Sequence, residues 1–182
     1  MARLKHYEEE NRCYFVTTTT QERNRLFVDQ QNCQILCNLP SNMRAGGQFL
    51  LLGFVIMPDH MHLLLVPQSE NTLPEIMRDL KRGSSRLIGR RLGKPGKVWM
   101  DGYYETGIRS EEQLLAALNY IQQNPVNAGL AATPEGFQFC SANPAFENDL
   151  VLALGQAAGL RTTPATEGRA GLAGLRITLA TE

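Results

Sequence analysis

Two histidines, His60 and His62, lie two residues apart in an otherwise apolar stretch of the sequence. Successive side chains of a β-strand point to opposite faces, so in a strand these two imidazoles project to the same face. Two adjacent imidazoles can chelate one cation, whereas a buried pair without a metal must stay neutral and find partners for its ring nitrogens. The alternative is a pair of ordinary strand residues hydrogen-bonded to their neighbours. The spacing alone leaves both interpretations open.

Tyr120 is a further candidate for chemistry. Leu114, Leu118 and Ile121 form the apolar stripe of a predicted helix, and Tyr120 falls to one side of that stripe. Four residues make about one helical turn, so Asn124 lies on the same face as Tyr120. A tyrosine at such a position is most often half-buried with a solvated hydroxyl. The pattern by itself therefore does not identify a nucleophile.

Basic residues gather in one segment, although the whole chain has a formal net charge of zero. Eight of the 18 basic residues lie between Arg78 and Lys97, against a single acid, Asp79. Such a cluster can bind a polyanion, and its candidate contacts are Arg78, Lys81, Arg82, Arg86 and Arg90. Lysine and arginine contacts to phosphates supply much of a protein's affinity for DNA. The same spacing also fits a solvated helix face.

The candidate residues must be positioned by strands and helices that the sequence also predicts. β-Branched and aromatic residues predict a strand over residues 14–20, and two nearly continuous apolar runs predict strands over 49–56 and 60–66, joined by a tight turn. Helical spacing predicts a helix over residues 28–43, with Pro40 and the later Gly46-Gly47 marking its end. The aromatic stretch over residues 98–108 is strand-like.

Two further helices have recognisable starts. Thr72 and Glu75 predict a capping box that opens the basic helix, and Gly93 begins its end. Ser110 and Gln113 cap the last helix, which Pro125 is expected to end near Asn124. The resulting order β-α-β-β-α-β-α predicts an α+β protein with a ferredoxin-like antiparallel sheet and helices packed on one face.

Length and composition limit the class of protein. A chain of 182 residues, of which 43% are hydrophobic, fits one globular domain, assigned to residues 1–147, with a weakly ordered tail over 148–182. No apolar run approaches the roughly 20 residues that a membrane span needs, which favours a cytoplasmic protein that does not act on a membrane. The cysteines have no paired metal-binding spacing and are expected to be reduced and structural: Cys13, Cys33, Cys37 and Cys140.

Three blocks of the sequence, in the expected order and spacing, resemble the REP-associated tyrosine transposases of the HUH superfamily, which are related to single-stranded insertion-sequence transposases. They are FVIMPDHMHLLL (54–65), which is similar to the HUH motif, VWMDGYYE (98–105) and YIQQNPVNAGL (120–130). The resemblance covers about residues 14–139. It implies that His60 and His62 hold a divalent metal, Mg²⁺ or Mn²⁺, and that Tyr120 attacks a phosphate. Asn124 stands where related transposases carry a third ligand, a glutamine, and Thr106 stands where the middle block often has a histidine.

The function implied by this resemblance is nicking and rejoining of single-stranded DNA at a palindromic, REP-type hairpin through a 5′-phosphotyrosine intermediate, as a monomer or homodimer. A hairpin-binding regulator that does not cut DNA is the alternative from another class, and a metal-dependent hydrolase that uses water ranks last. Three aromatic residues of the middle block can either stack on unpaired bases or pack in the core: Trp99, Tyr103 and Tyr104.

Overall fold

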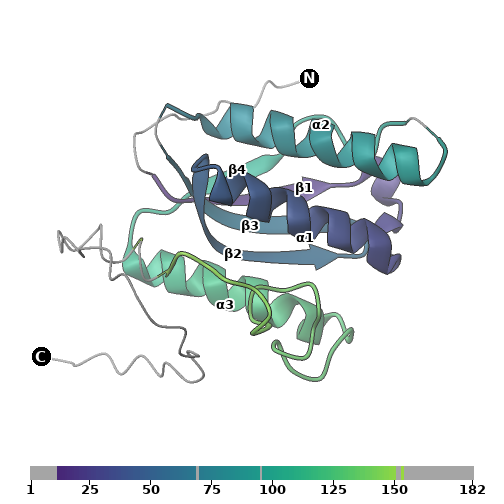
Figure 1. Ribbon diagram of the computed structural model, residues 1–182. Coiled ribbons are helices and arrows are strands. Elements are labelled where there is room, and N and C mark those ends of the chain that lie inside the picture. Colours follow the sequence, from purple (N-terminus) through teal and green to yellow (C-terminus); the bar gives the residue numbers. More distant parts are fainter. Residues whose placement is uncertain (1–11, 69, 95, 151–152, 154–182) are drawn as a thin grey trace, which may run out of the picture.

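The computed structural model describes residues 12–68, 70–94, 96–150 and 153 (Figure 1). Its centre is a four-stranded antiparallel sheet with the strand order β2-β3-β1-β4. The elements in chain order are β1 (Tyr14–Thr19), the short 3₁₀ helices η1 (Gln21–Arg23) and η2 (Leu26–Val28), α1 (Gln30–Ala45), β2 (Phe49–Met57), β3 (His60–Pro67), α2 (Leu73–Arg91), β4 (Tyr104–Gly107) and α3 (Glu111–Asn127). The predicted α+β class, antiparallel sheet and order of elements are confirmed.

The helices cover both faces of the sheet, which differs from the expectation that they share one face. Figure 1 shows α1 and α2 on one side of the sheet and α3 on the other. The reason is that β2 and β3 are apolar on both faces, so each face must be covered. On the α3 side, Leu52, Val55 and Leu64 form a buried cluster with apolar residues of α3.

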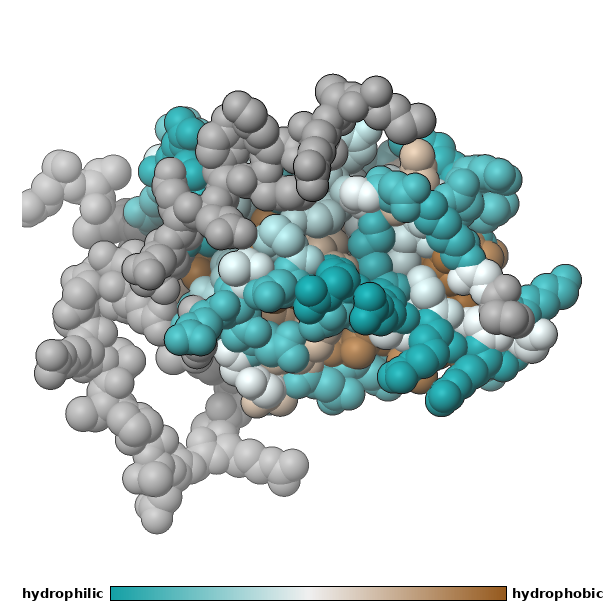
Figure 2. All heavy atoms as spheres, turned by 90° about the horizontal axis from the view of Figure 1, so that it is seen from above, coloured by the Kyte–Doolittle hydropathy of each residue, from teal (hydrophilic) through white to brown (hydrophobic). Residues whose placement is uncertain are grey.

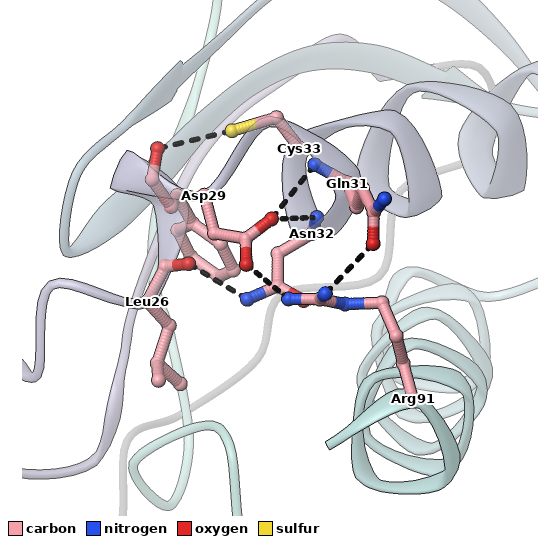
Figure 3. Close-up of polar contacts among 7 residues, drawn as sticks. Leu26, Asp29, Gln31, Asn32, Cys33 and Arg91 are labelled. Carbon is pink, nitrogen blue, oxygen red and sulfur yellow. Dashed lines mark hydrogen bonds and ion pairs between the residues drawn. The ribbon is translucent and has the colours of Figure 1, made fainter.

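The two helices on the other face are joined by close packing and by a polar network. A Cβ atom added to Gly83 of α2 would lie 3.0 Å from Leu39 Cδ2 of α1, so the glycine allows the helices to approach closely. Figure 3 shows Arg91 reaching from the end of α2 to Asp29, Gln31 and Asn32 at the start of α1. The Asp29 carboxylate also accepts from the Gln31 backbone N–H at 2.9 Å and so caps α1.

Helix starts agree with the prediction better than helix ends. The capping box of Thr72 and Glu75 is present, and Ser110 caps α3. The first helix, predicted over residues 28–43, spans Gln30–Ala45 and is followed by Gly46 as predicted. The last helix was expected to end near Asn124, but it continues past Pro125 to Asn127.

A proline inside a helix removes one backbone donor, and the tertiary structure can compensate for that loss. Pro125 leaves the carbonyl oxygen of Ile121 without its usual partner. The Cys140 thiol lies 3.9 Å from that oxygen and is fully buried against it. Pro125 is itself buried. Packing therefore maintains a helix that the local sequence predicts to end.

The chain that follows α3 runs along the outer edge of β2. The Ile56 N–H donates to the Phe139 carbonyl at 2.9 Å, and the Ser141 N–H donates to the Phe54 carbonyl at 2.9 Å. Further along, the buried Asp149 carboxylate accepts from the Leu51 N–H at 2.9 Å and from Arg44. This segment, residues 139–149, closes that edge of the sheet.

The division into a domain over residues 1–147 and a tail over 148–182 stays a prediction, because most of the tail lies outside the described residues. Within the described part, none of the helices is long and apolar enough to cross a membrane. The four cysteines are free thiols; three are buried, and Cys13 is partly exposed. Burial raises the pKa of Cys33 and Cys37 to about 12, which fits the predicted structural role.

Candidate active site

The turn between β2 and β3, formed by Pro58 and Asp59, fixes the position of His60. The Asp59 carbonyl accepts two hydrogen bonds from Thr20 at the end of β1, from its N–H at 2.8 Å and its hydroxyl at 2.9 Å. The Pro58 carbonyl accepts from the Phe27 N–H at 3.0 Å. These three bonds tie the turn to the neighbouring chain, so β3 begins at a defined place.

His62 is buried beside β1, with one ring nitrogen bonded and the other without a partner. Its Nδ1 lies 2.9 Å from the Thr17 hydroxyl oxygen, directly opposite in the β1–β3 ladder. Its Nε2 is buried and has no hydrogen-bond partner among the described residues. Burial, with a smaller contribution from the charge of His60, lowers the pKa of His62 to about 4. The ring is therefore neutral at pH 7 and can offer a nitrogen lone pair to a cation.

His60 is oriented by a carboxylate. Its Nδ1–H donates to Asp59 Oδ1 at 2.6 Å, which leaves Nε2 as the nitrogen with a free lone pair. Arg23 pairs with the other Asp59 oxygen at 3.2 Å. Partial burial opposes ionisation of Asp59, but the hydrogen bonds and charges of His60 and Arg23 outweigh it and lower the carboxyl pKa below its ordinary value. A carboxylate that fixes the ring of a histidine is a frequent companion of metal-binding imidazoles.

The structure brings Tyr120 to the two histidines. The His60 and His62 ring centroids are 4.9 Å apart, and the Tyr120 ring meets His62 edge to face at 5.2 Å. Phe15 stacks on His62 at 5.3 Å and contacts the Tyr120 ring at 5.8 Å. Tyr120 is 51% exposed, so a polymer in solvent can reach its hydroxyl. Residues 60 positions apart in the sequence thus form one cluster.

Asn124 lies one turn beyond Tyr120 on α3 and is partly buried. Among the described residues, no hydrogen bond involves its side chain, so its amide oxygen is available. Nor does the described part of the chain contain a group of three or more His, Cys, Asp or Glu side chains placed to hold a metal. A cation bound by the two imidazoles therefore needs a further ligand that is not a carboxylate or thiolate. The role of the Asn124 amide oxygen as that ligand stays a prediction.

The five candidate DNA contacts on α2 differ in their surroundings. Arg82, Arg86 and Arg90 are exposed and form no ion pair with any described residue. Arg78 is exposed and pairs with Asp79 at 3.0 Å. Lys81 donates to the Met100 carbonyl at 2.7 Å and also to the Gly102 carbonyl, and burial lowers its pKa. The ammonium of Lys81 thus supports the loop before β4, whereas the three arginines without an ion pair in the described part of the chain can bind a ligand.

These three arginines, which we call the arginine stripe, lie on the opposite side of the sheet from Tyr120. They are exposed residues of α2, which Figure 1 shows above the sheet, whereas α3, which carries Tyr120, lies below it. Figure 2 looks onto the α1–α2 layer, whose surface is mostly hydrophilic. A shallow hollow of about 460 Å³ lies at the end of the stripe, between Arg86, Arg90 and nearby glycines.

Three functional candidates emerge only from the structure: Thr17, Asp59 and Phe15. Asp59 precedes the first histidine directly, so its position in the turn was the one available signal. Thr17 and Phe15 contact His62 because of the register between β1 and β3, which the sequence does not reveal. Of the aromatic residues in the middle block, Trp99 and Tyr103 are buried in the core, whereas Tyr104 is 70% exposed.

Comparison with known proteins assigns the chain to a family. The model described as "Transposase IS200 like" matches residues 10–124, a range that contains both histidines, Tyr120 and Asn124. The chain belongs to the IS200-like transposase family.

Individual relatives of this IS200-like transposase are distant. It is 28% identical over 156 residues to an uncharacterized protein of Haemophilus influenzae, covering 68% of this chain and 86% of that protein. It is 22% identical over 138 residues to a second protein of that organism, named "Putative REP-associated tyrosine transposase", covering 70% and 78% of the two chains. Its fold matches the structure of a REP-associated tyrosine transposase bound to a REP hairpin, with a TM-score of 0.65, 20% identity and coverage of 94% and 97%.

Proposed function

We propose that this transposase nicks and rejoins single-stranded DNA beside a hairpin, with Tyr120 as the nucleophile and a divalent metal at His60 and His62. The observation that carries the proposal is the 5.2 Å contact between the Tyr120 and His62 rings, together with the buried and unpartnered Nε2 of His62. An unpaired polar atom in a buried site is costly unless a ligand satisfies it. A cation supplies that partner, because the Nε2 lone pair of the neutral imidazole can coordinate it.

A donor set of two imidazoles and one amide oxygen fits Mn²⁺ better than Mg²⁺, which prefers oxygen ligands. His60 and His62 would bind it through nitrogens whose rings Asp59 and Thr17 already orient, and the Asn124 amide would add an oxygen. Neutral ligands leave the full charge of the cation for the substrate, and manganese tolerates both imidazole and oxygen ligands. When bound, the metal polarises the phosphodiester and stabilises the charge that develops in the transition state.

The residues of the chain account for the remaining chemistry. The Tyr120 oxygen attacks the phosphorus and forms a bond to the DNA 5′-phosphate, while the bond to the 3′ oxygen breaks. The phenolic proton passes to solvent, to which half of Tyr120 is exposed, and the leaving 3′ oxygen takes up a proton. The phosphotyrosine bond conserves the energy of the broken bond, so attack by a 3′-hydroxyl reverses the step and joins strands.

The proposed substrate is a single strand with a palindromic, REP-type hairpin. The solved relative is bound to a REP hairpin, and the arginine stripe offers a phosphate backbone three exposed cations that pair with no carboxylate of the described residues. The stripe lies away from Tyr120, so a hairpin can bind without being cut. That separation favours the hairpin-binding regulator as the second candidate function.

A denaturing-gel assay separates the two candidates. Labelled single-stranded DNA with a hairpin and flanking strand is incubated with the full chain and Mn²⁺. The transposase proposal predicts a covalent protein–DNA adduct that Tyr120→Phe abolishes, because phenylalanine has no nucleophilic oxygen. Asn119→Ala, a change at the adjacent exposed position of α3, serves as the matched control and forms the adduct.

Binding of the hairpin to Tyr120→Phe persists in both cases and shows that the variant is folded. An adduct that survives in Tyr120→Phe means that another residue is the nucleophile. Hairpin binding by the wild type with no adduct at any flanking sequence supports the regulator.

A further inference from the structure

Tyr104 projects from the same face of the sheet as His62. It pairs with Thr17 in the β1–β4 ladder, and Thr17 pairs with His62 in the β1–β3 ladder. Residues directly opposite each other in an antiparallel sheet share a face, and the 2.9 Å contact between Thr17 and His62 confirms which face this is. Tyr104 therefore stands two strands away from His62, roughly 10 Å across the sheet.

The exposure of Tyr104 distinguishes it from its aromatic neighbours. Tyr103 is 9% exposed and belongs to the core cluster under α1 and α2, and Trp99 is 2% exposed and donates to the Ser84 hydroxyl at 2.9 Å. Tyr104 is 70% exposed. Among the described residues, no side-chain hydrogen bond or ring contact explains why a large aromatic ring on this strand is held with most of its surface exposed beside the candidate active site.

The two edges of the sheet offer different routes to the active site. Residues 139–149 cover the β2 edge through hydrogen bonds to Leu51, Phe54 and Ile56. At the other edge, β4 pairs with β1 alone among the described strands. Lys81 of α2 holds the loop that leads into β4, so this edge adjoins the basic helix. A DNA strand that runs from the arginine stripe past the loop held by Lys81 reaches the β4 edge at Tyr104, the first residue of β4.

We propose that Tyr104 is a stacking platform for one unpaired base of the DNA strand on its way to Tyr120. The inference rests on the proposed function and names the position at which the strand is held. Aromatic stacking tolerates every base, because each base has a π face, and it needs no hydrogen-bond partner. It holds the strand through a base, whereas the arginines hold phosphates, so the two contacts respond differently to salt.

The test measures binding, not cleavage, so that it stands apart from the chemistry. Tyr120→Phe protein, without added metal, is titrated with a fluorescent hairpin that carries a single-stranded flank. Adding Tyr104→Ala in this background weakens binding about tenfold, whereas Tyr104→Phe retains the ring and binds like the parent. The salt dependence of binding keeps its slope, because no phosphate contact is lost. A hairpin without the flank binds equally to all three proteins.

An abasic series locates the base. One abasic nucleotide is placed at each position of the flank in turn. At a single position it is expected to weaken binding to the parent protein, while at that same position it does not further weaken binding to the Tyr104→Ala protein. Equal losses at every position, or wild-type affinity of Tyr104→Ala for the flanked hairpin, would overturn the proposal. So would a change in oligomeric state in Tyr104→Ala with unchanged DNA affinity, since the ring would then contact a second copy of the chain. If the wild-type protein forms no adduct, the proposed nuclease activity is refuted, but the binding measurements still test whether Tyr104 contacts the single-stranded flank.

Discussion

The two faces of the sheet are built from the same strands but have different roles. Under α1 and α2, Met61, Leu63 and Leu65 of β3 are 0–1% exposed and belong to one continuous apolar cluster. On the α3 face, the alternate residue Leu64 joins a smaller apolar cluster, while His62 contacts a threonine hydroxyl and a tyrosine ring. The first face stabilises the domain, and the second provides the candidate active site.

This difference shows how one strand can serve stability and chemistry at once. The alternation of side chains places successive residues in separate environments, so a change at one residue need not disturb the next. A polar site is tolerated on the α3 face because the opposite face carries a complete core. Substitutions on one face are therefore expected to leave the properties of the other face unchanged.

Met61→Ala is expected to lower the free energy of unfolding by about 2–5 kcal/mol, because it removes a fully buried side chain and leaves a cavity under α1 and α2. Chemical denaturation measures the loss. The affinity of the molecules that remain folded for Mn²⁺ is expected to be unchanged, since Met61 points away from the imidazoles. A parallel loss of metal affinity would show that the two faces are not independent.

His62→Gln, one residue further along the same strand, is expected to weaken Mn²⁺ binding by more than about 100-fold. Loss of an outer partner of a metal ligand already costs about 10–100-fold, and the ligand itself contributes more. Isothermal titration calorimetry checks this directly, with Asp59→Asn as the intermediate case. Unchanged affinity in His62→Gln would place the metal elsewhere.

Mild acid is expected to destabilise the metal-free protein through His62. The imidazole has an ordinary pKa of 6.5 when unfolded and about 4 when folded. As the pH falls below 6.5, His62 becomes protonated in the unfolded chain, whereas in the folded chain it stays neutral until about pH 4. The free energy of unfolding therefore declines with falling pH. Between pH 7 and pH 5 this contribution amounts to about 2 kcal/mol. The loss, measured by urea denaturation in a chelator, should be smaller by that amount in His62→Gln.

Replacing the arginine stripe by glutamine, as Arg82→Gln, Arg86→Gln and Arg90→Gln together, should affect neither face of the sheet. The three residues are exposed, so the stability change should stay within about 0.5 kcal/mol per site. Hairpin affinity is expected to fall about tenfold, and the slope of log K against log salt should decrease by about three, one per lost phosphate contact. An unchanged slope would mean that the hairpin binds another surface.

Much of the fold was predictable because its signals are local. The alternation of β3, the Thr72 and Ser110 caps and the tight turn before His60 each depend on residues close together in the sequence, and all are present. The predicted end of the last helix at Pro125 was wrong for the complementary reason. It depended on a distant group, the Cys140 thiol that lies against the carbonyl freed by Pro125.

The candidate site likewise has features that local sequence predicts and features that depend on distant contacts. Residue types and spacing placed His60 and His62 on one face, and the family resemblance singled out Tyr120. Whether these residues meet was beyond local pattern, since the answer depended on α3 covering the histidine face of the sheet. The Thr17 contact to His62 likewise required the register of strands 45 residues apart.

The sequence by itself determined which side chains share a face, where helices begin and which residue types could bind a metal or attack phosphorus. These properties follow from the 2.0 and 3.6 residue periods of the backbone and need no knowledge of distant contacts. Tertiary structure alone decided that α3 lies across the sheet from α2, that Tyr120 meets His62, and that Tyr104 is exposed on β4, the edge strand of the described sheet. Those outcomes depend on strand register and on which apolar faces bury each other, and both are settled only when the whole chain packs.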